Sequence, residues 1–261
     1  MLNKFKKIVI KVGSNTLSND DGQISEKFIQ NLSEQVAKLV AQDKEVIIVS
    51  SGAKIAGISA INKWSRKSDI HYKQALCAIG QVRLLEHYKK NFANFDMHIA
   101  QILLTRDDFT NDSRILNIRN TLFTLLDENV VPIINENDTV CIEELKIGDN
   151  DTLGALTARI WDADILIILS DIDGLYDKNP KEHKDAKLLN SVSDIDSIIN
   201  EIEIGSTNDF GTGGIKTKLD AGKICNEYDI PMILANGRTE NVLEKIFANE
   251  IPYTMFMPKE N

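Results

Sequence analysis

The chain alternates between short apolar runs and longer segments in which apolar residues recur every three or four positions. The apolar runs predict strands at 5–12, 45–49, 97–105, 130–134, 164–169, 230–234 and 253–257. The segments of helical spacing predict helices at 25–39, 70–91, 113–129, 192–204 and 242–247. Because nearly all-apolar strands alternate with helices, we expect an α/β protein, a three-layer αβα sandwich around a mainly parallel open sheet.

The stretch 130–154 has the sharpest change from apolar to polar residues. Asn-Glu-Asn-Asp at 135–138 ends a predicted strand, and Gly-Asp-Asn-Asp at 148–151 leads into a helical pattern. Ligands of open α/β sheets bind at the carboxyl ends of the strands, so both polar groups are expected at one crevice. Carboxylates and amides there can hold an ammonium group, orient lysines or ligate Mg²⁺. Taken alone, the first of these sequences is more often a turn than a site.

Three more predicted strands end in loops that combine small polar residues with lysine, glycine or acid side chains, and these loops contain Lys11-Val12-Gly13, Ser50-Ser51-Gly52 and Ser170-Asp171. The glycine-rich segment 205–214 has the same character and precedes Lys216 and Lys218. Free N–H groups at such loops and at helix starts can bind anions. Lysines in the first turns of a helix oppose the helix dipole, and a bound polyphosphate would explain them. Each feature alone also fits a solvated lysine, a helix cap or a hinge.

Composition narrows the class of partner. The 261 residues are 43% hydrophobic and 26% charged, with a formal charge of −9 from 30 basic and 39 acidic residues. This argues against a nucleic acid or an anionic membrane as main partner. No apolar run is long enough for a membrane span or a signal peptide. Cys77, Cys141 and Cys225 show neither metal-ligand spacing nor a disulfide framework, so we expect a cytoplasmic protein.

In order and content, these motifs resemble those of the amino acid kinase family over about residues 8–256. The motifs are Lys11 to Ser14, Ser51-Gly52-Ala53, 101–106, 134–138, 148–151, 170–176 and Gly-Thr-Gly-Gly-x-x-Thr-Lys at 211–218. The segment 73–81 most resembles the branch that phosphorylates the γ-carboxylate of L-glutamate with ATP and Mg²⁺, the first step of proline biosynthesis. The resemblance implies one domain over 1–261, which binds the amino acid through about 1–160 and the nucleotide through about 161–261.

The resemblance also implies roles for individual residues. The catalytic set would be Lys11, Lys218 and Asp151, with Asp151 orienting both lysines. The glutamate-binding set would be Ser51, Gly52, Asn135, Asp138, Asp149 and Asn150. The ATP-binding set would be Lys11, Gly13, Ser170, Asp171, Thr212, Gly213, Gly214, Ile215, Lys216, Thr217 and Lys218. No residue is expected to ligate metal, because phosphate oxygens and water would hold most of the Mg²⁺.

Many members of that branch carry a PUA domain after the kinase domain, and this sequence has no segment that corresponds to it. The resemblance further implies a homodimer or homotetramer, proline as a feedback inhibitor and a glutamyl-phosphate reductase as a partner, with neither nucleic acid nor membrane bound. Two alternatives stay open. One is a family member that acts on acetylglutamate, aspartate or carbamate. The other is an amino-acid sensor without turnover, which the presence of both Lys11 and Lys218 argues against.

Overall fold

The computed structural model describes residues 4–61, 66, 68–141, 150–178, 180, 182–201 and 214–258. The strands are β1 (Lys7–Val12), β2 (Glu45–Ser50), β3 (His98–Leu104), β4 (Val130–Glu136), β5 (Ile165–Ser170), β6 (Ser191–Val192), β7 (Met232–Asn236) and β8 (Thr254–Phe256). The α-helices are α1 (Ser14–Leu17), α2 (Glu26–Val40), α3 (Ala53–Ile61), α4 (Ile70–Phe92), α5 (Asp112–Asp127), α7 (Asn150–Trp161), α8 (Ile195–Glu201), α9 (Ile215–Glu227) and α10 (Val242–Ala248). The described residues also contain two 3₁₀ helices, η2 (Ala93–Phe95) and η3 (Arg106–Phe109).

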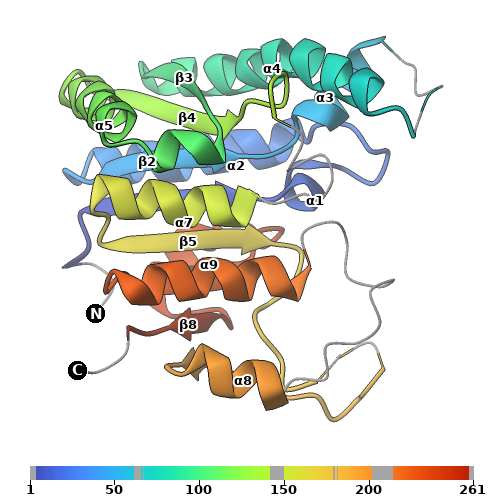
Figure 1. Ribbon diagram of the computed structural model, residues 1–261, viewed down its shortest axis with the longest axis vertical. Coiled ribbons are helices and arrows are strands. Elements are labelled where there is room, and N and C mark those ends of the chain that lie inside the picture. The colour runs from blue at the N-terminus through green and yellow to red at the C-terminus, as the bar shows by residue number, and fades with distance from the viewer. Residues whose placement is uncertain are drawn as a thin grey trace.

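The described strands form one sheet in the order β3-β4-β2-β1-β5-β7-β8-β6. Its pairings are parallel except for the antiparallel pair β7–β8. Helices α5, α7 and α9 cover one face of the sheet, and α2 lies on the other (Figure 1). The predicted three-layer αβα sandwich around a mainly parallel sheet is therefore confirmed. Within the described residues, none of the helices combines the length and apolar character that crossing a bilayer requires.

The alternation of side chains along β1 decides which layer each residue meets. Ile8, Ile10 and Val12 belong to the core that faces α2, α4 and α10. Val9 belongs to the second core, which β1 shares with α5, α7 and α9. Successive side chains of a strand point to opposite faces, so Lys11 lies on the same face as Val9 and is directed toward α7.

Most predicted elements are confirmed with small shifts at their ends. Ser25 is the N-cap of α2, and its hydroxyl accepts from the N–H of Phe28 at 3.3 Å. Asn111 is the N-cap of α5. The helix predicted over 192–204 is present as α8, but it begins later than predicted, at Ile195, because Val192 pairs with Phe256 in β6. Residues 202–204 lie outside the described residues.

A short helix was missed where the sequence predicted a loop after Gly13. In α1, the N–H groups of Thr16 and Leu17 donate to the Gly13 carbonyl at 3.1 and 3.0 Å. Four residues are too few to show an apolar period, so sequence spacing could not reveal this turn.

Two glycines let α3 and α4 approach each other closely. A Cβ atom at Gly80 would lie 1.7 Å from the carbonyl oxygen of Ala53, and one at Gly57 would lie 1.9 Å from that of Leu76. The small residues of α4 therefore serve close packing of two helices within one chain. The contact fixes α4 against the start of α3, which directly follows Ser51 and Gly52.

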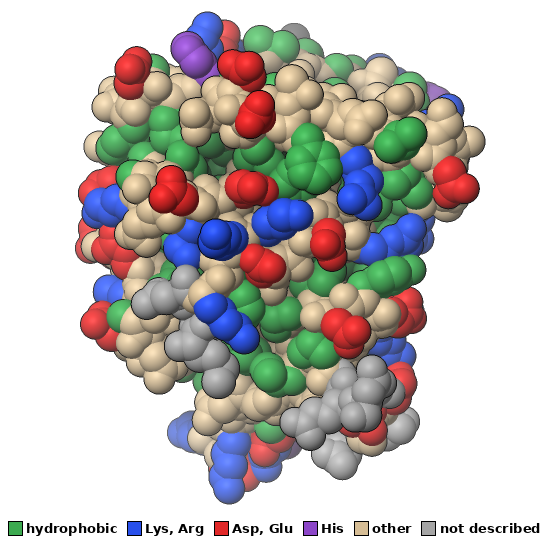
Figure 2. Space-filling model, turned by 90° about the vertical axis from the view of Figure 1, so that its left-hand side faces the viewer, with side chains coloured by type: hydrophobic (Ala, Val, Ile, Leu, Met, Phe, Trp, Pro, Cys, Tyr) green, Lys and Arg blue, Asp and Glu red, His purple; other side chains and the backbone are tan. Residues whose placement is uncertain are grey.

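Figure 2 shows the face that carries the amino-terminal ends of the parallel strands. Acidic and basic side chains are interspersed over the described part of that face. The side chains that the sequence singled out belong instead to the opposite edge, where β1, β2, β4 and β5 end.

We predict that Gly80→Ala lowers the free energy of unfolding by about 1–3 kcal/mol, the usual cost of overpacking. Helix propensity alone predicts the opposite sign, because Ala is better than Gly inside a helix by about 1 kcal/mol. Urea unfolding measures the difference. Ala78→Gly, at an exposed position of the same helix, is the matched control and should lose only the propensity term. A Gly80→Ala variant more stable than the wild type would contradict the packing.

Candidate active site

Two lysines from distant parts of the sequence meet on one carboxylate. Lys11 Nζ lies 2.6 Å from Asp151 Oδ1, and Lys218 Nζ lies 3.2 Å from Asp151 Oδ2. All three residues are buried, with 5%, 7% and 1% of the surface of Lys11, Lys218 and Asp151 exposed. The hydroxyl of Thr217 also donates to Asp151 Oδ2 at 2.8 Å. The predicted convergence of the two lysines on Asp151 is present.

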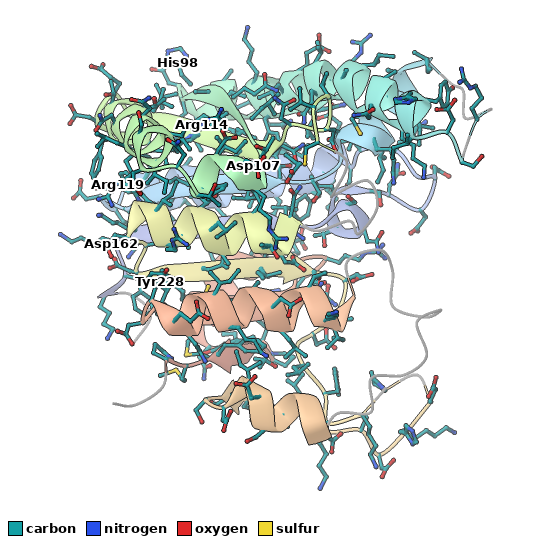
Figure 3. The ribbon with its side chains drawn as sticks, viewed as in Figure 1. His98, Asp107, Arg114, Arg119, Asp162 and Tyr228 are labelled. Atoms are coloured by element: carbon teal, nitrogen blue, oxygen red, sulfur yellow. The ribbon has the colours of Figure 1, made fainter. Side chains whose placement is uncertain are left out.

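The elements of the fold explain this convergence. The side chain of Lys11 points toward α7 because side chains alternate between the two faces of β1, and Asp151 is the second residue of α7. Asp162 and Tyr228, which directly follow α7 and α9, lie toward the same end of the molecule (Figure 3). Both helices therefore begin at the other end, where β1 and β5 finish. Lys218, in the first turn of α9, is thereby placed beside the start of α7.

Two lysines contact the one carboxylate of Asp151. Burial by itself raises the pKa of Asp151, but the neighbouring charges of Lys11 and Lys218 and the hydrogen bonds from Lys11 and Thr217 hold that pKa well below its usual range. Asp151 is therefore ionised at neutral pH, and Asp171 is a second carboxylate that interacts with the charge of Lys218. Two ammonium groups that converge in this way suit a bound phosphate or carboxylate.

A second cluster, built from amides and hydroxyls, lies next to the first in the sequence of α7. The Asn150 side-chain N–H₂ donates to Ser51 Oγ and to Asn135 Oδ1, both at 2.9 Å. This links the start of α7 to the ends of β2 and β4. Asn135 Nδ2 is itself buried and has no hydrogen-bond partner in the described part of the chain. The cluster therefore presents an unused amide donor, which suits a carboxylate oxygen.

Asp138 lies in the turn that follows β4, and it is 4% exposed. Burial is the main cause that raises the pKa of Asp138 to about 6, and the negative charge of Glu136 raises it further. A hydrogen bond from the Cys77 thiol and the positive charge of Lys54 lower this pKa in part. Asp138 Oδ1 is buried without a hydrogen-bond partner among the described residues. A cationic group bound at this oxygen would lower the pKa of Asp138, and the negative charge of the carboxylate would hold the cation.

The end of β5 and helix α1 carry a third group of polar side chains. Asn15 Nδ2 donates to Asp171 Oδ2 at 3.0 Å, and Ser170 Oγ donates to Asp171 Oδ1 at 3.2 Å. Burial raises the pKa of Asp171, but the Asn15 bond, the charge of Lys218 and the Ser170 bond hold it below its usual value. This group therefore borders the lysine cluster on the side of α9.

The Gly13 N–H does not fit the expectation of an open anion contact, because it donates to the Leu169 carbonyl at 3.1 Å. A Cβ atom at position 13 would lie 3.7 Å from Lys11 Nζ, so the glycine leaves room beside that ammonium group. Gly52 has a φ of +100°, which favours glycine, and a Cβ there would lie 3.2 Å from Leu17.

The remaining predicted residues fall into two groups. Gly214 is the N-cap of α9, Ile215 is half-buried and Lys216 is exposed, so of the two predicted lysines of α9 only Lys218 turns toward Asp151. Three predicted residues, Asp149, Thr212 and Gly213, lie outside the described residues. Among the residues that the structure describes, no group of three or more His, Cys, Asp or Glu is arranged to hold a metal ion.

Sequence reasoning did not assign Asn15, Lys54 or Cys77 to the site. Asn15 follows the Gly13 loop directly, and Cys77 lies inside the segment 73–81 that carried part of the resemblance, so both were adjacent to recognised motifs. An asparagine or a cysteine does not by itself indicate a binding site, so only the neighbouring carboxylate identifies Asn15 and Cys77 as part of this one.

Known proteins resemble this chain in sequence and in fold. A model of the amino acid kinase family matches residues 6–236. The chain is 61% identical over 256 residues to a glutamate 5-kinase of Alkaliphilus oremlandii, covering 98% of this chain and 97% of that protein. It is 46% identical to a glutamate 5-kinase of Caldanaerobacter subterraneus, covering 98% of this chain and 68% of that protein. Carbamate kinase from Giardia lamblia bound to AMP-PNP matches with a TM-score of 0.68 at 13% identity, over 98% of this chain and 99% of that one. At that identity, the likeness shows the fold alone.

The raised pKa of Asp138 predicts a pH-dependent stability. Between its ordinary pKa of 3.8 and about 6, the folded protein binds more protons at this group than the unfolded chain, so stability falls as the pH rises through that window. We predict that Asp138→Asn, without ligand, is more stable than the wild type at pH 8 by about 2–3 kcal/mol, since one pKa unit is about 1.4 kcal/mol.

Thermal unfolding at pH 4 and pH 8 measures this, and the difference should shrink toward zero at the lower pH. The matched control is Asp107→Asn, which alters an exposed carboxylate near the end of β3 (Figure 3). An Asp138→Asn variant no more stable than the wild type at pH 8 would show that the buried carboxylate carries no such penalty.

Proposed function

Because the chain belongs to the amino acid kinase family, we propose that it transfers the γ-phosphoryl group of ATP to the γ-carboxylate of L-glutamate. The products are ADP and L-glutamyl 5-phosphate, and the reaction is the first step of proline biosynthesis. Near-complete matches to proteins named glutamate 5-kinase support this choice of substrate. The observation that carries the chemistry is the pair Lys11 and Lys218 held on Asp151.

The difficulty of this reaction is electrostatic, because one anion must approach another. The acceptor carboxylate has a reference pKa of about 4.3, so it is ionised at neutral pH and needs no general base. Lys11 and Lys218 would neutralise the phosphoryl group as it moves and favour the transition state over the ground state. Asp151 would be a positioning residue that holds both ammonium groups in place before the substrates arrive.

The amide cluster and the Asp138 turn would bind glutamate. Asp138, through its buried Oδ1, would pair with the substrate ammonium group. Asn135, Asn150, Ser51 and Gly52 would hold the carboxylates, and Asp149 is a lesser candidate for a contact with glutamate. An acylated amine carries no charge for Asp138 to meet, so this pairing would disfavour acetylglutamate.

The nucleotide would lie on the side of β5 and α9. Ser170, Asp171 and the segment from 212 to Lys218 would line its site, with Gly13 beside the phosphates. The residues fit ATP in one respect, namely that the ammonium groups of Lys11 and Lys218 converge on one place. Mg²⁺, held mainly by phosphate oxygens and water, would supply further neutralisation of the phosphates. A dimer or tetramer, proline inhibition and delivery of the labile product to a reductase belong to the same proposal.

The direct test is ADP formation with a panel of acceptors, namely L-glutamate, acetylglutamate, aspartate and carbamate, with and without proline. The proposal expects turnover with Mg-ATP that depends on L-glutamate and a hydroxamate-trapped acyl phosphate. Turnover with another acceptor only would assign a different kinase activity. Binding of glutamate without ADP release would indicate a sensor.

We predict that Lys218→Ala lowers kcat by about 10²-fold or more, as loss of a charged transition-state contact does. The matched control is Lys223→Ala in the same helix, whose ammonium group pairs with Asp196 at 2.6 Å and is 41% exposed. The control should keep the wild-type kcat. If Lys218→Ala turned over at the wild-type rate while remaining folded, Lys218 would have no part in the chemistry.

Asp138→Asn tests the other end of the substrate. We predict a large rise in the KM for L-glutamate and little change in the KM for ATP, because the lost charge faces only the amino acid. Steady-state kinetics with each substrate varied in turn gives both values. A parallel rise of the two KM values would refute the assignment of Asp138 to the glutamate ammonium group.

A further inference from the structure

Helix α4 supports both turns that would bind the amino acid. Tyr88 hydrogen-bonds Ser50 at 2.9 Å between hydroxyl oxygens, and Gly80 packs directly on Ala53. These contacts fix the Ser51–Gly52 turn. At the start of α4, Gln74 Nε2 donates to the backbone carbonyls of Asp138 at 2.9 Å and of Thr139 at 3.1 Å. The same helix therefore fixes the position of the Asp138 turn.

Three polar residues share one stripe of α4. Gln74, Cys77 and Gln81 are spaced three and four positions apart, which places them on one side of the helix. Cys77 and Gln81 are buried, with 1% and 8% of their surfaces exposed. Neither side-chain polar atom of Gln81 has a hydrogen-bond partner in the part of the chain that the structure describes. Apolar side chains would satisfy simple packing at lower cost, so this stripe calls for a role besides packing.

Cys77 acts on the Asp138 carboxylate itself. Cys77 is buried one turn after Gln74 in α4, and it lowers the pKa of the Asp138 carboxyl by favouring its ionised form. Asp138 Oδ1 has no hydrogen-bond partner among the described residues. The charged groups that also act on Asp138 are Glu136 of β4 and Lys54 of α3. Gln74 thus holds the backbone of the turn, and Cys77 holds the side chain, with one oxygen left for a ligand.

We propose that Gln74 and Cys77 are positioning residues for the amino-acid subsite, which orient Asp138 so that its unpartnered oxygen meets the ammonium group of the substrate. This inference rests on the proposed function for the identity of that substrate. The two residues act on different parts of Asp138, and the difference can be measured. Cys77 favours the ionised form of Asp138, whereas Gln74 contacts only main-chain carbonyls.

The test compares Cys77→Ala, Cys77→Ser and Gln74→Met with the wild type in kcat/KM for L-glutamate as a function of pH. In Cys77→Ala, loss of the thiol hydrogen bond raises the pKa of Asp138, so the acid limb should move to higher pH and the glutamate KM should rise several-fold. Cys77→Ser restores a donor and should return the acid limb toward that of the wild type. Gln74→Met should raise the glutamate KM without moving the acid limb.

The control is Lys89→Met, an exposed position of the same helix, which should change neither quantity. The KM for ATP should stay constant in all variants. A Cys77→Ala enzyme with an unmoved acid limb would overturn the proposal, as would equal rises in both KM values with a lower melting temperature, which would indicate packing alone.

A second readout separates this proposal from the proposed function. Carboxyl ¹³C NMR of the free protein, assigned by comparison with Asp138→Asn, follows the titration of Asp138 without any substrate. A higher titration midpoint in Cys77→Ala is expected whether or not glutamate is turned over. A wild-type protein that forms no ADP with glutamate defeats the proposed function, and an unchanged midpoint defeats the role of Cys77 even in an active enzyme.

Discussion

Asp151 is the residue on which the site depends, because a single buried carboxylate holds two lysines from opposite ends of the chain. Removing one partner of a buried ion pair leaves an uncompensated charge, which typically costs about 3–5 kcal/mol. Three elements of the fold position these residues independently. Lys11 points toward α7 because side chains alternate along β1, Asp151 lies at the start of α7, and Lys218 lies in the first turn of α9. The two ammonium groups converge where an anion can bind, so a bound phosphate would gain contacts with both.

The amino-acid subsite is built by different means. Its groups are mainly neutral amides and hydroxyls around Asn150, joined to one carboxylate, Asp138, whose burial raises its pKa. The free protein therefore keeps an acceptor that is unfavourable when charged and becomes favourable when a cation arrives. Two neighbouring subsites, one with two convergent lysines and one with a buried acid, suit a substrate that carries an ammonium group at one end and receives a phosphoryl group at the other.

Much of this could be predicted from the sequence because its signals are local. Apolar runs marked the strands, and the polar residues after them marked the edge where ligands bind, so Lys11, Asp138 and Asp151 were found. The sequence does not show which distant segments become neighbours in the folded chain. The sequence could not show that Val192 pairs with Phe256, that the Gly13 N–H is used by Leu169, or that a cysteine of α4 contacts Asp138. Each of these depends on which distant segments become neighbours after folding.

The most direct test of the central claim is a crystal structure with L-glutamate, Mg-ADP and a planar fluoride that mimics the transferring phosphoryl group. We predict that the ammonium groups of Lys11 and Lys218 both lie within hydrogen-bond distance of this group, with Asp151 still between them. A structure in which either lysine points away from the planar group, with both substrates bound, would contradict it.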